Sequence, residues 1–184
     1  MKRALDVALA VLMLPVAAPV ILVCMAAIKA TSPGPALFRQ TRIGRNEAPF
    51  ICNKLRTMHA GTRDVPTHEA SAAALTPIGL WLRRLKLDEL PQLWNILRGD
   101  MSFVGPRPCL PSQTQLIAAR RARGLYTIRP GVTGVSQVAG VDMSDPETLA
   151  ALDATYLADM SAGADLRLIL ATALGAGRGD SVRR

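Results

Sequence analysis

Two adjacent acids, Asp88 and Glu89, lie in a mainly cationic and apolar stretch of the sequence, residues 83–108, which reads RRLKLDELPQLWNILRGDMSFVGPRP. The basic residues around them are Arg83, Arg84, Lys86, Arg98 and Arg107. Neighbouring cations stabilise the ionised form of a carboxyl group. A fixed, ionised carboxylate is what a covalent nucleophile or a metal ligand requires. The stretch therefore predicts a site where a carboxylate meets a phosphate or a metal ion.

The same two acids also have a purely structural interpretation. An aspartate just before a helix is a good N-cap, and a glutamate in the first turn suits the positive end of the helix dipole. A helix N-terminus can also hold a phosphate group. The spacing of Asp88 and Glu89 before the apolar run 90–97 is compatible with both interpretations, and both stay open at this point.

Two further segments present arginines in rigid or glycine-rich surroundings. Arg107 lies between Pro106 and Pro108, so its backbone is restricted and its guanidinium is suited to a bidentate grip on a diphosphate. The alternative is a surface arginine in a proline loop. Arg129 opens the segment RPGVTG at 129–134, whose backbone N–H groups could form an anion-binding nest.

The first thirty residues form an apolar segment that begins with Lys2 and Arg3 and carries no charge from Val7 to Ile28. As a straight helix this uncharged run would reach about 33 Å, close to the thickness of a bilayer core. It has three interpretations: a cleaved signal peptide, a spanning helix, or a re-entrant helix that enters one leaflet and returns.

The prolines and the flanking charges favour the re-entrant form. Pro15 and Pro19 lie in the middle of the apolar run, and each removes a backbone donor and disturbs the preceding turn. Basic residues flank the run on both sides. Because positive flanks tend to stay on the cytoplasmic face, both ends are expected on the same side of the membrane.

The remaining sequence predicts a mainly α fold with a small β-hairpin, an α+β class. Residues 36–58 hold two short extended runs around GRNEAP, typical of a hairpin. Residues 76–87 have helical spacing with Trp81 beside arginines, which indicates either an interfacial helix or an ordinary amphipathic helix on a core. We expect a membrane segment at 1–30 and a catalytic domain on the cytosolic side at 31–184.

The composition narrows the class of partner. The chain has 184 residues, a formal charge of +8 and 49% hydrophobic residues, a combination that suits a membrane surface with anionic headgroups. Only 4% of the residues are aromatic and no recognition-helix signature is present, so we expect no nucleic-acid partner. The three cysteines and two histidines are not at metal-ligand spacing.

Five segments together resemble the bacterial sugar transferases, the small monotopic phosphoglycosyl transferases. They are KRALDVALAVLMLPVAAPVIL, PALFRQTRIGRN, NKLRTM, LRRLKLDELPQLWNILRGDMSFVGPRP and RPGVTGVSQVAG, and they run nearly end to end. The resemblance implies transfer of a sugar 1-phosphate from a UDP-sugar to a polyprenyl phosphate, with release of UMP, as a first membrane step of glycan assembly. The non-enzymatic alternative is a basic, membrane-anchored scaffold protein.

The resemblance also implies roles for individual residues. Asp88 would form a covalent aspartyl phosphosugar, and Glu89 with Mg²⁺ would lie by the diphosphate, the two acids serving as metal ligands. Arg83 and Arg107 would contact phosphates, and Arg129 and Gln137 would lie on the nucleotide side.

The same resemblance bears on the membrane segment. The family breaks its re-entrant helix at a Ser-Pro pair, which corresponds here to Ala18 and Pro19. The break then depends on Pro19 without a serine hydroxyl. The implied location is the cytoplasmic face of the bacterial inner membrane, in contact with membrane lipids.

Overall fold

The computed structural model describes residues 2–62 and 72–177. In this part the chain is mostly helical, as the sequence predicted, and it has two small sheets where one hairpin was expected. The longer elements are α1 (Lys2–Thr31), β1 (Leu37–Ile43), β2 (Pro49–Leu55), α2 (Pro77–Arg84), α3 (Gln92–Arg98), β3 (Ser102–Val104), α4 (Thr114–Ala122), β4 (Gly131–Thr133), α5 (Val135–Val138), α6 (Pro146–Ala158) and α7 (Ala162–Ala173). Short 3₁₀ turns are η1 (Arg45–Glu47), η3 (Ala72–Ala74), η4 (Leu87–Glu89) and η5 (Leu125–Thr127).

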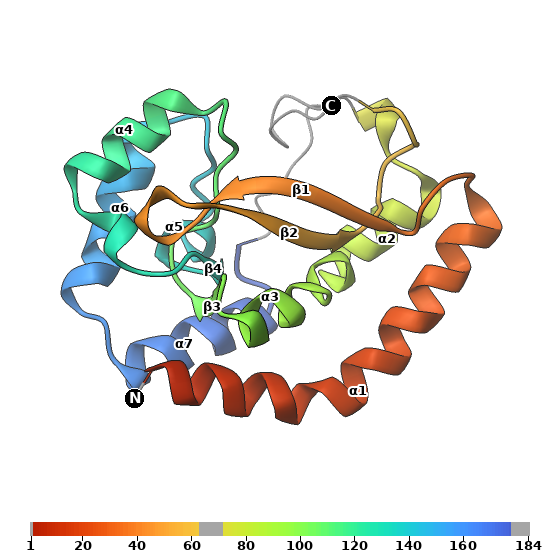
Figure 1. Ribbon diagram of the computed structural model, residues 1–184, viewed down its shortest axis with the longest axis horizontal. Helices are drawn as coiled ribbons and strands as arrows, with labels where there is room; N and C mark the ends of the chain where they lie inside the picture. The colour runs from red at the N-terminus through yellow and green to blue at the C-terminus, as the bar shows by residue number, and fades with distance from the viewer. Residues whose placement is uncertain (1, 63–71, 178–184) are drawn as a thin grey trace.

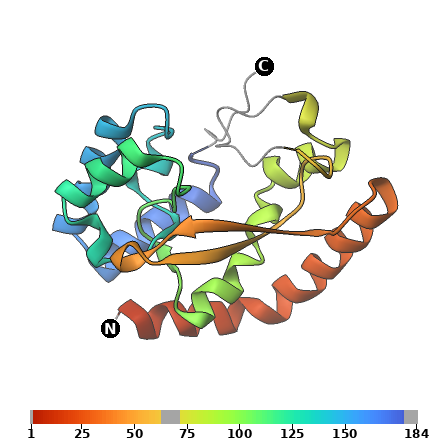
Figure 2. The ribbon, with the colours of Figure 1, turned by 45° about the horizontal axis from the view of Figure 1, so that its top comes forward.

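The predicted hairpin at residues 36–58 is confirmed. Strands β1 and β2 are antiparallel, with Leu37 opposite Leu55 and Ile43 opposite Pro49. Figures 1 and 2 show this hairpin reaching from the group of α4, α5 and α6 to the end of α2. The hairpin therefore connects the part of the domain that contains α4, α5 and α6 with the part that contains α2.

The segment 129–140 forms one short strand, β4, followed by α5. Strand β4 pairs in parallel with β3, from Ser102 opposite Gly131 to Val104 opposite Thr133. The two backbone segments approach so closely that a Cβ atom on Gly131 would lie 2.1 Å from the backbone nitrogen of Gly105. Glycine at both positions is what permits this pairing.

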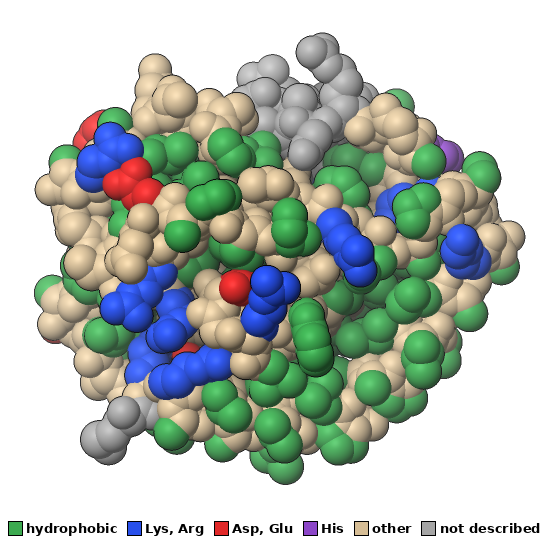
Figure 3. Space-filling view, viewed as in Figure 1, with side chains coloured by type: hydrophobic (Ala, Val, Ile, Leu, Met, Phe, Trp, Pro, Cys, Tyr) green, Lys and Arg blue, Asp and Glu red, His purple; other side chains and the backbone are tan. Residues whose placement is uncertain are grey.

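Helix α1 lies along the base of the domain with one narrow face buried. The buried residues Asp6, Ala10, Ala17, Cys24 and Ile28 recur every four or seven positions and face α3, β2 and α2. Most of the other apolar side chains point outward. The helix is long and apolar enough to cross a membrane, and Figure 3 shows hydrophobic atoms along the lower edge of the molecule that it forms. An apolar surface of this extent is typical of contact with lipid.

The expected interruption of α1 at Ala18 and Pro19 is not present. Both Pro15 and Pro19 lie inside one continuous helix. The helix instead bends near its middle (Figure 1). A proline removes one backbone bond and pushes the preceding turn aside, which kinks a helix without requiring that the flanking residues leave the helical conformation.

The start of α1 is attached to the domain by polar contacts. Lys2 Nζ lies 2.6 Å from Asp165 Oδ2. Arg3 donates to the carbonyl oxygens of Ile96 and Leu97 at 2.5 and 2.9 Å. The carboxylate of Asp6 accepts from Ser102 Oγ at 2.9 Å. The first turns therefore belong to the domain surface.

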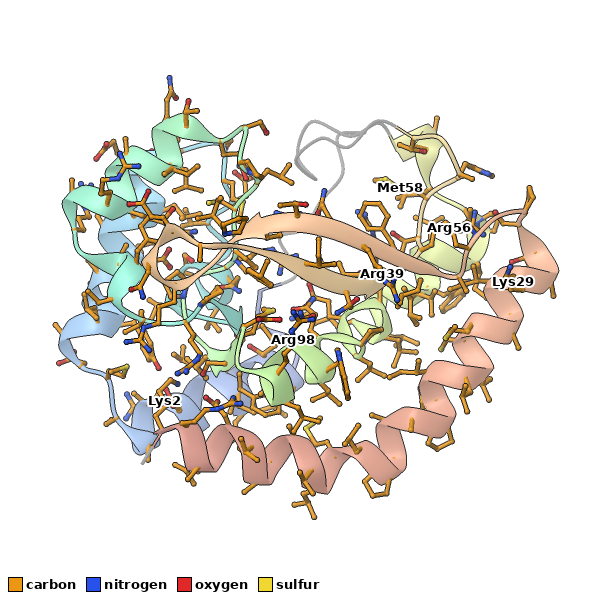
Figure 4. The ribbon with its side chains drawn as sticks, viewed as in Figure 1. Lys2, Lys29, Arg39, Arg56, Met58 and Arg98 are labelled. Atoms are coloured by element: carbon orange, nitrogen blue, oxygen red, sulfur yellow. The ribbon has the colours of Figure 1, made fainter. Side chains whose placement is uncertain are left out.

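The end of α1 is attached to the same body. Ile28 is buried in a cluster with Leu55 and Leu82. Just after the helix, Arg56 Nη1 donates to Ser32 Oγ at 3.0 Å. Figure 4 labels Lys2 and Lys29 at the two ends of the bent helix, each beside the rest of the domain. A straight helix of this length would leave one end far from the domain. The bend is therefore what allows both ends of α1 to contact the domain.

Candidate active site

The two acids lie in η4, the 3₁₀ turn between α2 and α3. Helix α3 begins after Pro91, so Asp88 is not its N-cap and the capping interpretation does not hold. Asp88 is 8% exposed. It nevertheless lines a cavity of about 750 Å³ together with Glu89. Its carboxylate is therefore part of a cavity wall rather than of a closed core.

The cavity is strongly cationic. Among the described residues that line it, seven are lysine or arginine and three are acidic. The basic ones are Arg42, Lys54, Arg56, Arg83, Arg84, Lys86 and Arg107, and the acidic ones are Asp88, Glu89 and Asp142. A cavity of this volume with this excess of cations suits a ligand that carries several negative charges.

Glu89 is fixed by two cations that share one of its oxygens. Lys54 Nζ lies 3.1 Å and Arg107 Nη2 2.9 Å from Glu89 Oε1. Burial favours the neutral acid, but Arg107 and Lys54 together outweigh it and lower the pKa of Glu89 to about 2. Glu89 is therefore ionised and held in place at neutral pH.

Asp88 differs from its neighbour. Burial is the largest influence and raises the pKa of Asp88 to about 6. The charge of Glu89 acts in the same direction, whereas Lys54, Arg83 and Arg107 oppose the shift. The neighbouring cations do stabilise the ionised form, as expected, but burial of Asp88 outweighs them. Asp88 is still mostly ionised at pH 7.

Arg83 is positioned by the way α2 begins. Thr76 is the N-cap and its Oγ1 accepts from the Gly79 nitrogen at 3.0 Å. Helix α2 packs so tightly on the end of β2 that a Cβ on Gly79 would lie 2.0 Å from the Thr57 carbonyl oxygen. One turn later Arg83 Nε donates to Thr57 Oγ1 at 2.9 Å. The guanidinium lines the cavity as predicted.

Arg107 is held at its backbone as well as at its side chain. Its carbonyl oxygen accepts from Arg120 Nη1 at 2.7 Å. Arg120 in turn forms a fully buried ion pair with Asp153, at 2.7 Å, in which the two side chains are 2% and 1% exposed. The proline-flanked loop is therefore anchored to α4 and α6, which fixes the direction from which Arg107 reaches Glu89.

The two residues expected on the nucleotide side are separated. Gln137 lines the cavity, where its Nε2 donates to the Val132 carbonyl oxygen at 3.1 Å. Arg129 is not among the residues that line it, and its Nε donates to the Gly99 carbonyl oxygen at the end of α3, at 2.7 Å. The reason is topological, because Arg129 precedes β4 and Gln137 follows it, so the strand places them at opposite ends.

Five cavity cations were not singled out as site residues from the sequence, namely Arg42, Lys54, Arg56, Arg84 and Lys86. Lys54 contacts Glu89 from β2, Lys86 precedes η4, and Arg42 reaches across from β1 to donate to the Pro108 carbonyl oxygen at 2.9 Å. Lys54 and Arg42 lie in NKLRTM and PALFRQTRIGRN, two of the five segments that carry the family resemblance. That resemblance could have indicated both residues as part of the site.

A model of the bacterial sugar transferase family matches residues 1–178. A Caulobacter vibrioides protein named UDP-glucose:undecaprenyl-phosphate glucose-1-phosphate transferase is 44% identical over 93% of this chain and 67% of its own length. A Komagataeibacter xylinus protein named undecaprenyl-phosphate glucose phosphotransferase is 38% identical over 93% of this chain and 35% of its own length.

A third relative is similar to this chain over most of its own length. The exopolysaccharide production protein ExoY of Sinorhizobium fredii is 36% identical over 93% of this chain and 83% of its own length. The chain thus spans about a third of the Komagataeibacter protein and most of ExoY.

Proposed function

Because the chain belongs to the bacterial sugar transferase family, we propose that it transfers a sugar 1-phosphate from a UDP-sugar to a polyprenyl phosphate and releases UMP. The observation that carries the proposal is a buried carboxylate, Asp88, in the wall of a cavity lined by seven cations. The names of the relatives supply the substrates, since each of the two phosphotransferases carries undecaprenyl phosphate in its name.

The proposed reaction proceeds in two displacements at Asp88. A carboxylate oxygen attacks the phosphorus that bears the sugar, the phosphorus–oxygen bond to UMP breaks, and an aspartyl phosphosugar forms. An oxygen of the polyprenyl phosphate then attacks the same phosphorus, which restores the carboxylate and yields a polyprenyl diphosphate sugar. Arg83 and Arg107 stabilise the phosphoryl oxygens in both steps.

The contacts support this division of labour between the two acids. Glu89 Oε1 is occupied by Lys54 and Arg107 at 3.1 and 2.9 Å, so its charge is already balanced. Asp88 has a raised pKa because it is buried, and a more basic carboxylate is the better nucleophile. Arg83 and Arg107, which reach the cavity from α2 and from the proline loop, are proposed to bind the phosphates.

The donor set also fits Mg²⁺. Magnesium in proteins is commonly bound by one or two carboxylates together with substrate phosphates, rather than by a complete protein cage. Asp88 and Glu89 supply hard oxygen ligands in the wall of a cavity suited to phosphates, and among the described residues no group of three potential ligands forms a cage. We propose that these two residues hold the ion, which would neutralise charge on the diphosphate.

We further propose that α1 is re-entrant, and that the domain lies on the cytoplasmic face. The bend and the attachment of both helix ends to one domain support this topology. Trp81 on α2 and Trp94 on α3 are 62% and 63% exposed, which suits residues at the headgroup level. The active carboxylate would then lie where a soluble nucleotide sugar and a lipid-borne phosphate can meet.

Cysteines placed at the two ends of α1 should both be reachable only from the cytoplasmic side. Ala4 and Thr31 are exposed, and the three native cysteines are buried. In intact spheroplasts, Ala4→Cys and Thr31→Cys should resist a membrane-impermeant maleimide, and in inverted vesicles both should react. Labelling of position 4 from outside would establish a spanning helix. Val16→Cys, at the exposed middle of the helix, serves as the lipid-buried control.

The rate of UMP release should fall as pH is lowered through about 6. Asp88 has its pKa raised to about 6 by burial, so protons added below that value convert the nucleophile to a neutral acid. Below it we expect a loss of about tenfold per pH unit, with a plateau above pH 7. Glu89, with a pKa of about 2, should not contribute. Initial rates from pH 4.5 to 8, with circular dichroism as a folding check, test this; a flat profile to pH 5 would contradict it.

The activity itself is tested by incubating the purified protein with polyprenyl phosphate, Mg²⁺ and a panel of UDP-sugars, and by measuring UMP. At least one sugar should give UMP and a lipid-linked diphosphate sugar in equal amounts. If no sugar yields UMP from a folded, vesicle-bound protein, the transferase proposal fails and the scaffold alternative gains.

A further inference from the structure

The end of α7 and the residues that follow it form part of the cavity. Thr172, Ala176 and Gly177 line the same space as Asp88 and Glu89, although they lie more than eighty residues away in the sequence. We define the segment Thr172–Gly177 as the C-terminal wall. None of the residues so far given a role in the transfer belongs to it.

Three contacts hold the wall in place. Thr172 Oγ1 lies 2.5 Å from Thr133 Oγ1 at the end of β4. Gly177 has a φ of +71°, and a Cβ there would lie 2.4 Å from the Gln137 carbonyl oxygen, so only glycine permits this approach to α5. On the other side of the cavity, Lys86 Nζ donates to the Ala176 carbonyl oxygen at 2.9 Å. The wall therefore joins α5 to the residue two positions before Asp88.

The chemistry of the wall differs from that of the phosphate site. The residues of the wall and those opposite it in β4 and α5 are uncharged, and they present hydroxyl, amide and carbonyl groups. The polar side chains among them that line the cavity are Thr133, Ser136, Gln137 and Thr172. A neutral surface of hydrogen-bonding groups matches a neutral, hydroxyl-rich ligand rather than a phosphate.

We propose that the C-terminal wall contacts the sugar of the donor and contributes to its selection, and that Lys86 is the residue that positions the wall. This inference rests on the proposed transferase function. In an in-line displacement the leaving group departs on the side opposite to the nucleophile, whereas the sugar oxygen stays beside the attacked phosphorus. The wall is attached next to Asp88 through Lys86, so it lies nearer to the sugar than to the departing UMP.

The conformation of Lys86 is consistent with a positioning role. Its φ of +56° lies in the left-handed region, which is uncommon for a residue other than glycine. The residue both opens the turn that carries Asp88 and binds the wall, so a change in one is transmitted to the other.

The test compares donors rather than total activity. Thr172→Val keeps the shape of the side chain and removes its hydroxyl, and Lys86→Met removes the contact to Ala176 while retaining the stem. For both variants we expect the ratio of kcat/KM between UDP-glucose and UDP-N-acetylglucosamine to change by about five- to tenfold, as the loss of one ordinary hydrogen bond gives. The inhibition constant of UMP should stay the same.

Two matched variants serve as controls. Thr155→Val removes an exposed hydroxyl on α6, which bonds only to its own helix at the Leu152 carbonyl oxygen, and should leave the ratio unchanged. Lys86→Arg retains a donor at position 86 and should restore most of the wild-type ratio. Melting temperatures confirm that each variant is folded.

The remaining outcomes separate the two proposals. If both donors and UMP weaken by the same factor, the wall does not select the sugar. If the ratio is unchanged in folded Thr172→Val and Lys86→Met, the wall does not contact it. In either case an active wild-type protein leaves the transferase proposal intact, whereas a wild type inactive with every UDP-sugar refutes that proposal instead.

Discussion

The Asp88→Asn variant should release UMP at least about a thousandfold more slowly than the wild type, since removal of a covalent nucleophile costs this much or more. An amide has nearly the same shape as the carboxylate but is a far weaker nucleophile. The carboxylate is 8% exposed and its pKa is raised by burial, so ionisation of Asp88 is disfavoured by the fold. The variant should therefore retain or slightly raise the melting temperature while it loses activity.

A second readout isolates the covalent step. With UDP-sugar and no lipid acceptor, the wild type should gain the mass of one phosphosugar, and Asp88→Asn should not. Asp159→Asn, an exposed aspartate at the end of α6, is the matched control and should behave as the wild type. Retention of UMP release in a folded Asp88→Asn protein would remove the basis for the nucleophile assignment.

The parts of the site that could be predicted from sequence are those in which neighbouring residues act together. Asp88 and Glu89 are adjacent, so any fold that exposes one to a cavity places the other nearby. The restriction of Arg107 by its two prolines is likewise a local property of the backbone. Residues 36–58 formed the predicted hairpin because alternation and turn residues are short-range signals.

The long-range partners could not be predicted in the same way. Lys54 and Glu89 are 35 residues apart, and their contact depends on how the hairpin packs against η4. The raised pKa of Asp88 depends on burial, which is a property of the whole domain and not of the flanking charges. Arg129 lies outside the cavity because β4 pairs with β3, a parallel pairing of residues 29 positions apart that no local pattern predicts.

The membrane segment has some features that neighbouring residues predict and others that depend on long-range contacts. The position of the bend follows from Pro15 and Pro19, which are visible in the sequence. The helix stays continuous across both prolines, and its two halves pack in two different clusters, the first through Ala10 and Ala17 and the second through Cys24 and Ile28. Asp6 was overlooked because an acid near the start of an apolar run has no sequence signature for its partner, which here is Ser102.

Loss of Arg107 should have the second largest effect on the reaction. Its guanidinium lies in the cavity wall, anchored through Glu89 at 2.9 Å and through its own carbonyl oxygen at Arg120. A positioned cation that stabilises charge on a transferring phosphoryl group is worth about 10²–10³ in kcat. We expect that loss in Arg107→Ala, and a smaller one in Arg107→Lys, which keeps the charge but not the planar fork. The control is Arg121→Ala on α4, which removes an exposed ion pair with Glu47 of η1 and should leave kcat unchanged.

A double-mutant cycle with Lys54→Met then distinguishes two roles for Arg107. Lys54 and Arg107 bind the same oxygen of Glu89, so if Arg107 acts only by holding that carboxylate, the second substitution should add little to the first. If Arg107 also binds the donor phosphate, the two losses in kcat should multiply. We expect multiplication, because we propose that Arg107 binds the donor phosphate in addition to its contact with Glu89. A double variant no slower than Arg107→Ala would reduce Arg107 to a support for Glu89.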